Sequence, residues 1–394
     1  MALFDHSTYE NRFGTVAVRT ADAEIGEVEI TTFRSDHDYA DFRRPHRVEF
    51  GDSVELDLAR RDFTVNAVAW GAEPDGTPGL VDPHAGRADM GTGTLRAVGD
   101  PTRRFREDAL RMIRAVRLAA TLDFTVEPGT LAAITDHAEL VQHLSGERVA
   151  RELARLLAAP RPSIGLRLLH DTGMLARLWP ALAAQRGVPQ NKIEGEDLWD
   201  HTLRAVDAAT TPTLRLAALF HDIGKPSTMA DGRFVGHETV GADQTRLLLD
   251  ELHWAHAERD RVIRLIRHHM FGYVPTWSDA AVRRFIVKVG PDLLEDLFLL
   301  READNVGSGR ERDTSDLTEL RTRVGQLSAG VALDLHGLAV DGSDLIAELG
   351  LAPGPVIGRI LAKLLDRVIG DPGLNTRDRL LATARAIVAQ EPGP

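Results

Sequence analysis

The chain is predicted to be an α+β protein, with a small mixed region at its N-terminal end and an all-helical remainder. Three observations predict this division. β-Prone residues occur between residues 14 and 34, a Gly/Pro-rich stretch follows at residues 71–91, and helical apolar spacing dominates from about residue 100 onward. A chain of 394 residues is long enough for several compact domains with buried cores.

Two short strands are expected in the first region. Residues 15–18 are β-prone, and polar and apolar residues alternate over residues 27–32. The stretch "GAEPDGTPGLVDPHAGRADMG" (71–91) is expected to form a loop, because glycine and proline interrupt regular structure.

The helical remainder is predicted from apolar residues that recur at i, i+3, i+4 and i+7 spacing. The clearest segments are "FREDALRMIRAVRLAA" (105–120), "RVARELARLLAA" (148–159), "TPTLRLAALFHDIGKP" (211–226) and the tail segment 354–390. The third helix is expected to stop at Gly224 and Pro226, and the tail is expected to form two helices around the turn "GDPG".

Composition restricts the class of protein. No run of about eighteen apolar residues is present, and the N-terminus lacks the pattern of a signal peptide, so we expect a cytoplasmic protein that does not enter a membrane. The absence of cysteine leaves His, Asp and Glu as side-chain metal ligands. A net charge of −12 argues against a protein that coats nucleic acid indiscriminately.

A local basic stretch nevertheless lies between Arg96 and Arg117, which contains seven arginines and three acidic residues. Taken alone, this net charge of +4 is more typical of a solvated helix face than of a nucleic-acid site. On the same predicted helix, Asp108 and Arg111 offer an acceptor beside a planar donor fork, which can hydrogen-bond the edge of a base. The alternative is an intrahelical salt bridge.

Four segments occur in an order that resembles class II CCA-adding tRNA nucleotidyltransferases and related poly(A) polymerases. They are "VEITTFR", "LDLARRDFTVNA", "DPTRRFREDALRMIRAVRLAA" and a later "HD". The resemblance covers nearly the whole chain and implies an incomplete polymerase-β-like nucleotidyltransferase head (residues 1–87), a neck (88–145), a helical body with an HD domain (146–310) and a helical tail (311–394). It implies a reaction that adds C and A from CTP and ATP to the 3′ end of tRNA.

The resemblance also implies roles for residues of the head and neck. Arg61, Asp62 and Asn66 match a motif that contacts the phosphates and sugar of the nucleotide, and Asp108 and Arg111 match the pair that reads its base. Arg114 is expected to join the nucleotide-binding residues, and the residues expected to bind RNA are Arg103, Arg104 and Arg117. An Arg61 ion pair with a nearby carboxylate is the structural alternative.

Transfer chemistry of this type uses Mg²⁺ held by clustered carboxylates. The resemblance implies an Asp-x-Asp strand and a Gly-Gly/Arg-Asp loop, neither of which precedes "ENRFGTVAV". Glu29 is the candidate for a third carboxylate. We expect a chain that is truncated within its head, with loss of the transferase centre as the alternative.

A second constellation resembles the HD metal-dependent phosphohydrolases. Its predicted ligands are His201, His221, Asp222, His237, His268 (or its neighbour His269) and Asp304. Mixed nitrogen and oxygen ligands suit a divalent transition metal such as Mn²⁺, Co²⁺ or Ni²⁺. Lys225 could contact phosphate or be solvated in a loop, and His253 and His256 are expected at the surface.

Two rival functions follow from the same sequence. The chain could act mainly as an HD phosphohydrolase on nucleotides or RNA ends, or as a tRNA-binding protein without transferase activity. The sequence leaves open full CCA addition against partial addition, and it leaves the oligomeric state open.

Overall fold

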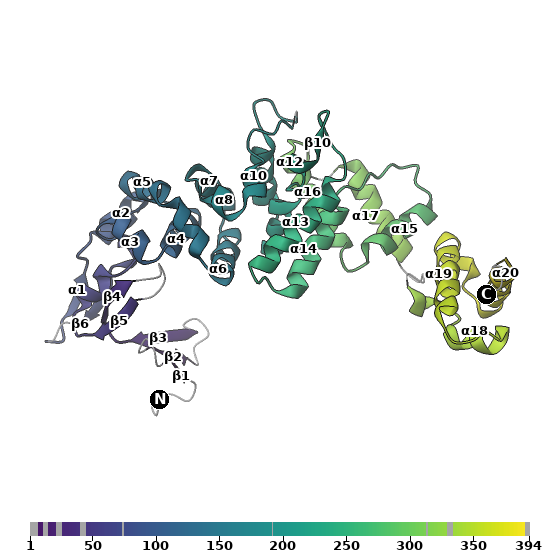
Figure 1. Ribbon diagram of the computed structural model, residues 1–394, viewed down its shortest axis with the longest axis horizontal. Coiled ribbons are helices and arrows are strands. Elements are labelled where there is room, and N and C mark those ends of the chain that lie inside the picture. Colours follow the sequence, from purple (N-terminus) through teal and green to yellow (C-terminus); the bar gives the residue numbers. More distant parts are fainter. Residues whose placement is uncertain are drawn as a thin grey trace. The chain divides into compact units, whose positions relative to one another are not determined.

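The computed structural model describes residues 7–10, 15–20, 26–39, 45–72, 75–190, 192–312, 314–328 and 334–390. Figure 1 shows the elements of the chain in sequence colours, and the chain divides into two compact units. The first contains Met1–Val188 and Leu247–Trp254, and the second contains Pro189–Arg246 and Ala255–Pro394. The predicted α+β division is confirmed, because strands of the first unit precede a largely helical chain.

The first unit begins with small antiparallel sheets. Strands β1, β2 and β3 pair in that order, β4 pairs with β5, and β6 pairs with β7. Their bounds are β1 Ser7–Glu10, β2 Thr15–Arg19, β3 Glu27–Thr31, β4 Arg34–Tyr39, β5 Pro45–Phe50, β6 Ala69–Ala72 and β7 Pro78–Val81. The two strands predicted between residues 14 and 34 are therefore present.

Residues 71–91 differ from the predicted loop. They contain strand β7 and most of helix α2 (Gly86–Thr92), so the Gly/Pro-rich composition marks tight connections between short elements. Gly86 is needed for packing, because a Cβ there would lie 2.1 Å from the Thr64 carbonyl oxygen. Helix α2 can therefore begin directly against the short 3₁₀ turn η1 (Thr64–Asn66).

The remaining elements of the first unit are helical apart from the short parallel pair β8 (Thr94–Leu95) and β9 (Thr125–Val126). They are α1 Val54–Ala59, α3 Pro101–Glu107, α4 Leu110–Leu122, α5 Pro128–Asp136, η2 Ala138–His143, α6 Gly146–Leu157, α7 Pro162–Asp171, α8 Met174–Leu178 and α9 Pro180–Ala183. Helix α4 packs against α6 and α7. Residues 146–188, which the sequence assigns to the body, therefore belong to the first unit.

The second unit is almost wholly helical. Its elements are α10 Leu198–Ala208, α11 Pro212–Phe220, α12 Lys225–Thr228, β10 Met229–Ala230, β11 Arg233–Phe234, α13 His237–Glu251, α14 His256–His268, α15 Asp279–Val289, α16 Leu294–Gly307, α17 Ser315–Ser328, η3 Leu335–Gly337, α18 Gly342–Leu349, α19 Pro355–Gly370, η4 Pro372–Leu374 and α20 Arg377–Gln390. The last residues of α13 are grouped with the first unit.

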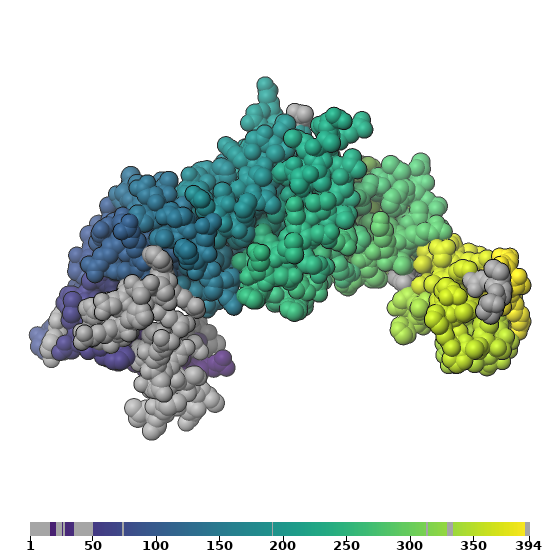
Figure 2. Space-filling view, viewed as in Figure 1, coloured from purple at the N-terminus to yellow at the C-terminus, as the bar shows by residue number. Residues whose placement is uncertain are grey.

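The helices of this second unit pack in two separate groups. Helix α10 packs on α11 and α16, and the atoms of α10 to α17, coloured teal to green in Figure 2, form a continuous surface. Helices α18 to α20 enclose a separate apolar cluster that includes Leu345, Ile360, Leu364 and Ala384. The two predicted tail helices, α19 and α20, are confirmed. None of the helices in the described ranges is long and apolar enough to cross a membrane.

Helix α11 ends earlier than predicted. Its last residue is Phe220, and Pro226 lies in the first turn of the next helix, α12, where proline is tolerated because that N–H needs no helical partner. Gly224 allows a close approach between these segments, since a Cβ there would lie 2.4 Å from the His237 carbonyl oxygen. This contact brings the start of α12 against the start of α13.

Candidate functional sites

Asp62 organises the arginine-rich segment that follows α1. Its carboxylate is 9% exposed and accepts hydrogen bonds from the Phe63 N–H at 2.9 Å and from Asn66 Nδ2 at 3.1 Å. Arg114 Nε donates to the other carboxylate oxygen at 2.7 Å. Three of the predicted nucleotide-binding residues are thus joined in one hydrogen-bonded group.

Electrostatics keep this group ionised. Burial raises the pKa of Asp62, but the Arg114 charge and the hydrogen bond from Asn66 outweigh it, so the pKa lies below its usual value. The Asp62 carboxylate therefore stays charged at neutral pH and fixes the Arg114 guanidinium beside η1.

Arg61 lies at the edge of this group. Its side chain is 43% exposed, donates to the Asn66 carbonyl oxygen at 3.1 Å and lies 3.3 Å from Asp57. The ion pair weighed as the structural alternative is thus present, with Asp57, which also binds Arg60 at 2.6 Å. Since nearly half of the Arg61 side chain is open to solvent, it remains accessible to a ligand.

The continuous helix predicted over residues 105–120 is wrong, because the chain leaves the helical conformation at Asp108. Helix α3 ends at Glu107, Asp108 is extended (φ −150°, ψ 105°), and α4 begins at Leu110. The Asp108 carboxylate accepts a hydrogen bond from the Leu110 N–H at 3.1 Å. Short polar side chains that bond nearby backbone in this way compete with helix continuation.

Asp108 and Arg111 each have protein partners. Arg148 donates to the Asp108 carboxylate at 2.7 Å. Arg111 donates to Glu107 at 2.8 Å and to the carbonyl oxygens of Arg104 and Arg60. The salt bridge weighed for this helix therefore exists for Arg111 with Glu107, and any base must share these groups with the protein.

The three residues expected to bind RNA differ in accessibility. Arg103 is 73% exposed, whereas Arg104 is buried and binds Glu107 at 2.8 Å. Arg117 donates to the buried Glu152 at 2.6 Å, with 13% of its side chain exposed. Arg104 and Arg117 are thus held in ion pairs that a buried charge needs. Their part in RNA binding stays a prediction.

Glu29 lies on β3, opposite Ala17, and its side chain is exposed. The described part of the chain contains two groups of side chains able to hold a metal ion, and Glu29 belongs to neither.

The HD constellation converges in the second unit. The first group combines His201 from α10, His221 from the end of α11 and Asp304 from α16. The second group combines Asp222, His237 from the start of α13 and His269 from the end of α14.

Asp222 joins the two groups. Its Oδ2 lies 3.3 Å from His201 Nε2 and 3.1 Å from His221 Nε2, and its Oδ1 lies 3.3 Å from His237 Nε2 and 3.6 Å from His269 Nε2. Neither oxygen makes a hydrogen bond of normal geometry, although both are buried. One carboxylate thus faces four imidazoles.

The imidazole tautomers favour a cation. The Nδ1 atoms of His237 and His269 each lie 2.7 Å from a backbone carbonyl oxygen, which can only accept. Both Nδ1 atoms therefore carry hydrogen, and the two Nε2 lone pairs face each other at 3.3 Å. His221 has the same arrangement with the Ala218 carbonyl oxygen. Lone pairs this close need a proton or a metal ion between them, so the residues fit a divalent metal.

Charge at the cluster also matches metal ligands. Burial raises the pKa of Asp222, but the neighbouring His221 and Lys225 charges hold it well below its ordinary value. The pKa of Asp304 is lowered to about 2, because His221, Lys192 and His201 outweigh its burial. Metal ligands must be deprotonated, and both carboxylates already are.

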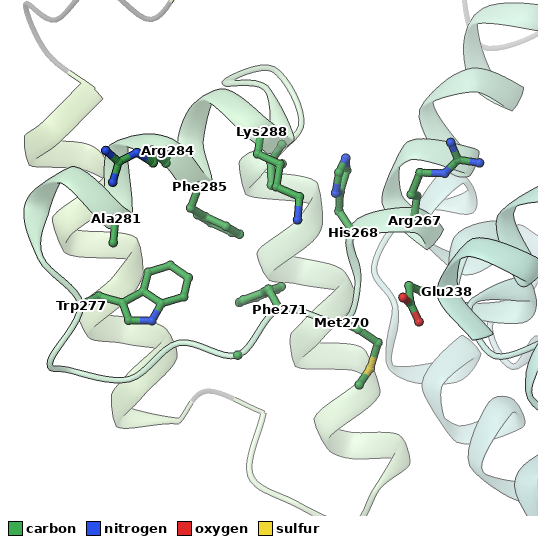
Figure 3. A pocket seen from close by; sticks show the side chains of 12 residues that line it. Glu238, Arg267, His268, Met270, Phe271, Trp277, Ala281, Arg284, Phe285 and Lys288 are labelled. Atoms are coloured by element: carbon green, nitrogen blue, oxygen red, sulfur yellow. The ribbon is translucent and has the colours of Figure 1, made fainter. Parts of the chain in front are cut away.

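The predicted metal ligands lie close together, with the exception of His268. His269 is buried in the cluster, whereas the side chain of His268 lines a separate cavity (Figure 3). Consecutive residues at a helix end point in different directions, so the dipeptide itself could not decide between them. His253 and His256 are exposed, as expected.

Two lysines also lie at the cluster. Lys225 is buried with Nζ 2.6 Å from Asp222, so it is not solvated in a loop. Lys192, which sequence reasoning missed, lies 3.8 Å from Asp304. The rarity of lysine could have indicated it, because the whole chain has four lysines and two of them lie at this cluster.

Family models match three stretches of the chain. The model described as "Poly A polymerase head domain" matches residues 2–96, the probable RNA and SrmB-binding site of polymerase A matches 123–186, and the HD domain matches 199–308. The predicted order of a head, an RNA-binding region and an HD domain is confirmed.

Similar proteins support the same family. The chain is 35% identical to a CCA-adding enzyme of Levilactobacillus brevis over 90% of this chain and 78% of that one. It is 36% identical to a CC-adding tRNA nucleotidyltransferase of Thermus thermophilus (79% and 73% covered) and 33% identical to an A-adding one of Deinococcus radiodurans (89% and 82% covered).

Solved structures agree with the sequence relatives. The Bacillus stearothermophilus CCA-adding enzyme in complex with CTP superposes with a TM-score of 0.71 at 28% identity, covering 99% of this chain and 85% of that one. The chain therefore belongs to the family of CCA-adding tRNA nucleotidyltransferases and contains an HD domain.

Proposed function

We propose that this protein adds C and A from CTP and ATP to the 3′ end of tRNA in the cytoplasm. The observation that carries the proposal is the hydrogen-bonded group of Asp62, Asn66 and Arg114, which unites two sequence motifs at one place. Arg61, exposed beside this group, would bind phosphate through its planar and permanently charged fork.

Asp108 and Arg111 would read the base. The Asp108 carboxylate accepts hydrogen bonds, and Arg111 is held in place by Glu107 and two backbone carbonyl groups. A guanidinium fixed in this way loses little entropy when it binds a ligand. The base would displace Arg148 from Asp108, or share the carboxylate with it.

Nucleotide selection tests this proposal. With tRNA lacking CCA and tRNA ending in CC, Asp108→Ala should lower the preference for CTP and ATP over UTP and GTP. Each lost base contact should cost about 1–3 kcal/mol of selectivity. Arg148→Ala is the matched control, since it removes the ion pair and keeps the acceptor. Equal losses of selectivity in both variants would assign Asp108 a structural role.

Metal dependence is shared by these enzymes and HD domains. For transfer we propose Mg²⁺, but Glu29 stands apart from both metal-ligating groups, so the described residues do not by themselves provide its site.

We propose a second activity, hydrolysis of a phosphoester, at the HD cluster. A divalent transition metal such as Mn²⁺, Co²⁺ or Ni²⁺ would be held by His201, His221, Asp304, Asp222, His237 and His269, and would lower the pKa of a bound water and polarise a phosphate. Lys192 is 28% exposed beside Asp304 and would attract the phosphate. Lys225, which is buried, would keep Asp222 ionised and in position.

Release of product from a nucleoside 2′,3′-cyclic phosphate tests this second activity with Mn²⁺, Co²⁺, Ni²⁺ and Mg²⁺ compared side by side. His221→Ala and Asp222→Ala should abolish hydrolysis, whereas His256→Ala, at an exposed histidine, should preserve it. Hydrolysis that needs no metal, or none with any metal, would leave the cluster without this role.

A further inference from the structure

A cavity of about 460 Å³ lies in the second unit, outside the metal-binding group (Figure 3). Its volume is within the usual range for small-molecule sites, roughly 300–1,000 Å³. Side chains from the end of α14, the segment after it and α15 line most of it. No role already described uses this cavity.

Aromatic rings form much of the lining. Phe271 lies 5.3 Å from Phe285 between ring centroids, and Trp277 lies 6.0 Å from Phe285. Tyr273 extends the cluster at 5.5 Å from Trp277. Aromatic residues make up 5% of the whole chain, so this concentration is unusual for it. Aromatic faces at the edge of an open space are suited to stacking on a planar base.

Positive charge adjoins the rings. Figure 3 shows the Lys288 side chain directed toward Phe271, with His268 beside it and Arg284 and Arg267 extending outward. Arg267 binds Asp243, and Arg284 pairs with Asp366, whereas the described residues provide Lys288 with no ion pair. A free ammonium group next to aromatic rings, in a chain of net charge −12, favours an anion that carries an aromatic group.

The cavity is also connected to the metal cluster. The Arg301 guanidinium lies 4.5 Å from the centre of the Phe271 ring and donates to the Phe271 carbonyl oxygen at 3.0 Å. The same guanidinium lies 3.7 Å from Asp304. One side chain therefore touches both the cavity wall and a predicted metal ligand.

We propose that this cavity binds a nucleotide, with its base stacked on Trp277 and Phe271 and its phosphate held by Lys288. The nucleotide is either free or the unpaired terminal nucleotide of an RNA strand, because both present the same base and phosphate. This inference is independent of hydrolysis at the metal cluster, since stacking and ion pairing need no metal.

Calorimetric titration of the full chain in EDTA measures the binding with AMP, CMP, adenosine and a short single-stranded RNA. Trp277→Ala should weaken AMP binding roughly tenfold or more, and Trp277→Phe, which keeps a ring, should weaken it less. Lys288→Ala should weaken AMP but not adenosine, and Lys363→Ala, at a lysine outside the cavity, should change neither. Binding of RNA that is much tighter than AMP, with the same sensitivity to these variants, identifies an RNA end as the source; comparable affinities identify the free nucleotide.

Photo-cross-linking with 8-azido-AMP separates this cavity from the nucleotide site of the first unit. The label should appear in the tryptic peptide 268–283, which contains Phe271 and Trp277. Label confined to peptides of the first unit, or AMP affinity unchanged in both Trp277→Ala and Lys288→Ala, would overturn the proposal. Hydrolysis of a cyclic phosphate without nucleotide binding in the cavity would overturn the binding proposal and support the proposed hydrolase activity. Nucleotide binding in the cavity without hydrolysis would support the binding proposal and contradict the hydrolase activity.

Discussion

Arg114 Nε donates a hydrogen bond of 2.7 Å to the Asp62 carboxylate across 52 residues of sequence. This contact joins the segment after α1 to helix α4. It also connects two of the sequence motifs on which the nucleotide-binding proposal rests.

Asp62→Ala should destabilise the first unit. It leaves Arg114, whose side chain is 30% exposed, without its closest carboxylate. Breaking a fully buried ion pair costs about 3–5 kcal/mol, so we expect a loss of about 2–3 kcal/mol for this partly exposed arginine. Urea-induced unfolding followed by circular dichroism measures the loss. Arg103→Ala removes a mostly exposed guanidinium that pairs with Glu107 and should cost less than about 1 kcal/mol. Similar costs for the two variants would contradict the importance of the buried pair.

The contribution of Asp62 should depend on pH. The folded pKa is lower than the unfolded value of about 3.9, so the stabilisation is fully present above about pH 5 and disappears as the pH falls through the folded pKa. The free energy of unfolding should therefore differ most between wild type and Asp62→Asn near neutral pH. This difference should shrink in acid. A difference that is constant from pH 7 to pH 3 would show that the ionised carboxylate does not cause the stabilisation.

Exposed arginines of the neck should supply the salt-dependent part of tRNA affinity. Arg103 and Arg106 are exposed, so replacing both by glutamine should weaken binding and reduce the salt slope by roughly 1.4 to 1.8, because each phosphate contact contributes about 0.7–0.9. Filter binding at several salt concentrations provides the measurement. Arg87→Gln, an exposed arginine of α2, is the control and should leave the slope unchanged. Equal slopes in all proteins would place the tRNA surface elsewhere.

Metal should stabilise the second unit through the HD cluster. A ligand at a hundred times its Kd adds about 2.7 kcal/mol to folding stability, so saturating Mn²⁺, Co²⁺ or Ni²⁺ should raise the unfolding temperature and EDTA should reverse the rise. His237→Ala and His269→Ala should weaken this response, because the group of His201, His221 and Asp304 remains, whereas the exposed-site variant His256→Ala should leave it unchanged. A response of undiminished size after loss of both His237 and His269 would rule out the second metal-ligating group.

Several helices, the family and the HD domain of this protein could be predicted from its sequence alone. Periodicity predicted α6, α11, α19 and α20, since burying one apolar face of a helix requires apolar residues at helical spacing. The order of the arginine, aspartate and histidine motifs also indicated the family and the HD domain, because those side chains serve chemistry and occupy fixed places in the chain.

Tertiary structure decided which of these charged groups remain free to act. A local pattern predicted one helix through Asp108, but the side chain of Asp108 bonds the Leu110 N–H and starts a new one. Arg117 lies in a basic stretch that favours RNA binding, yet its guanidinium donates a hydrogen bond to the buried carboxylate of Glu152, 35 residues away. His269 rather than His268 faces Asp222. Such outcomes depend on partners distant in sequence, because the free energy of a buried charge is set by the groups that folding brings next to it.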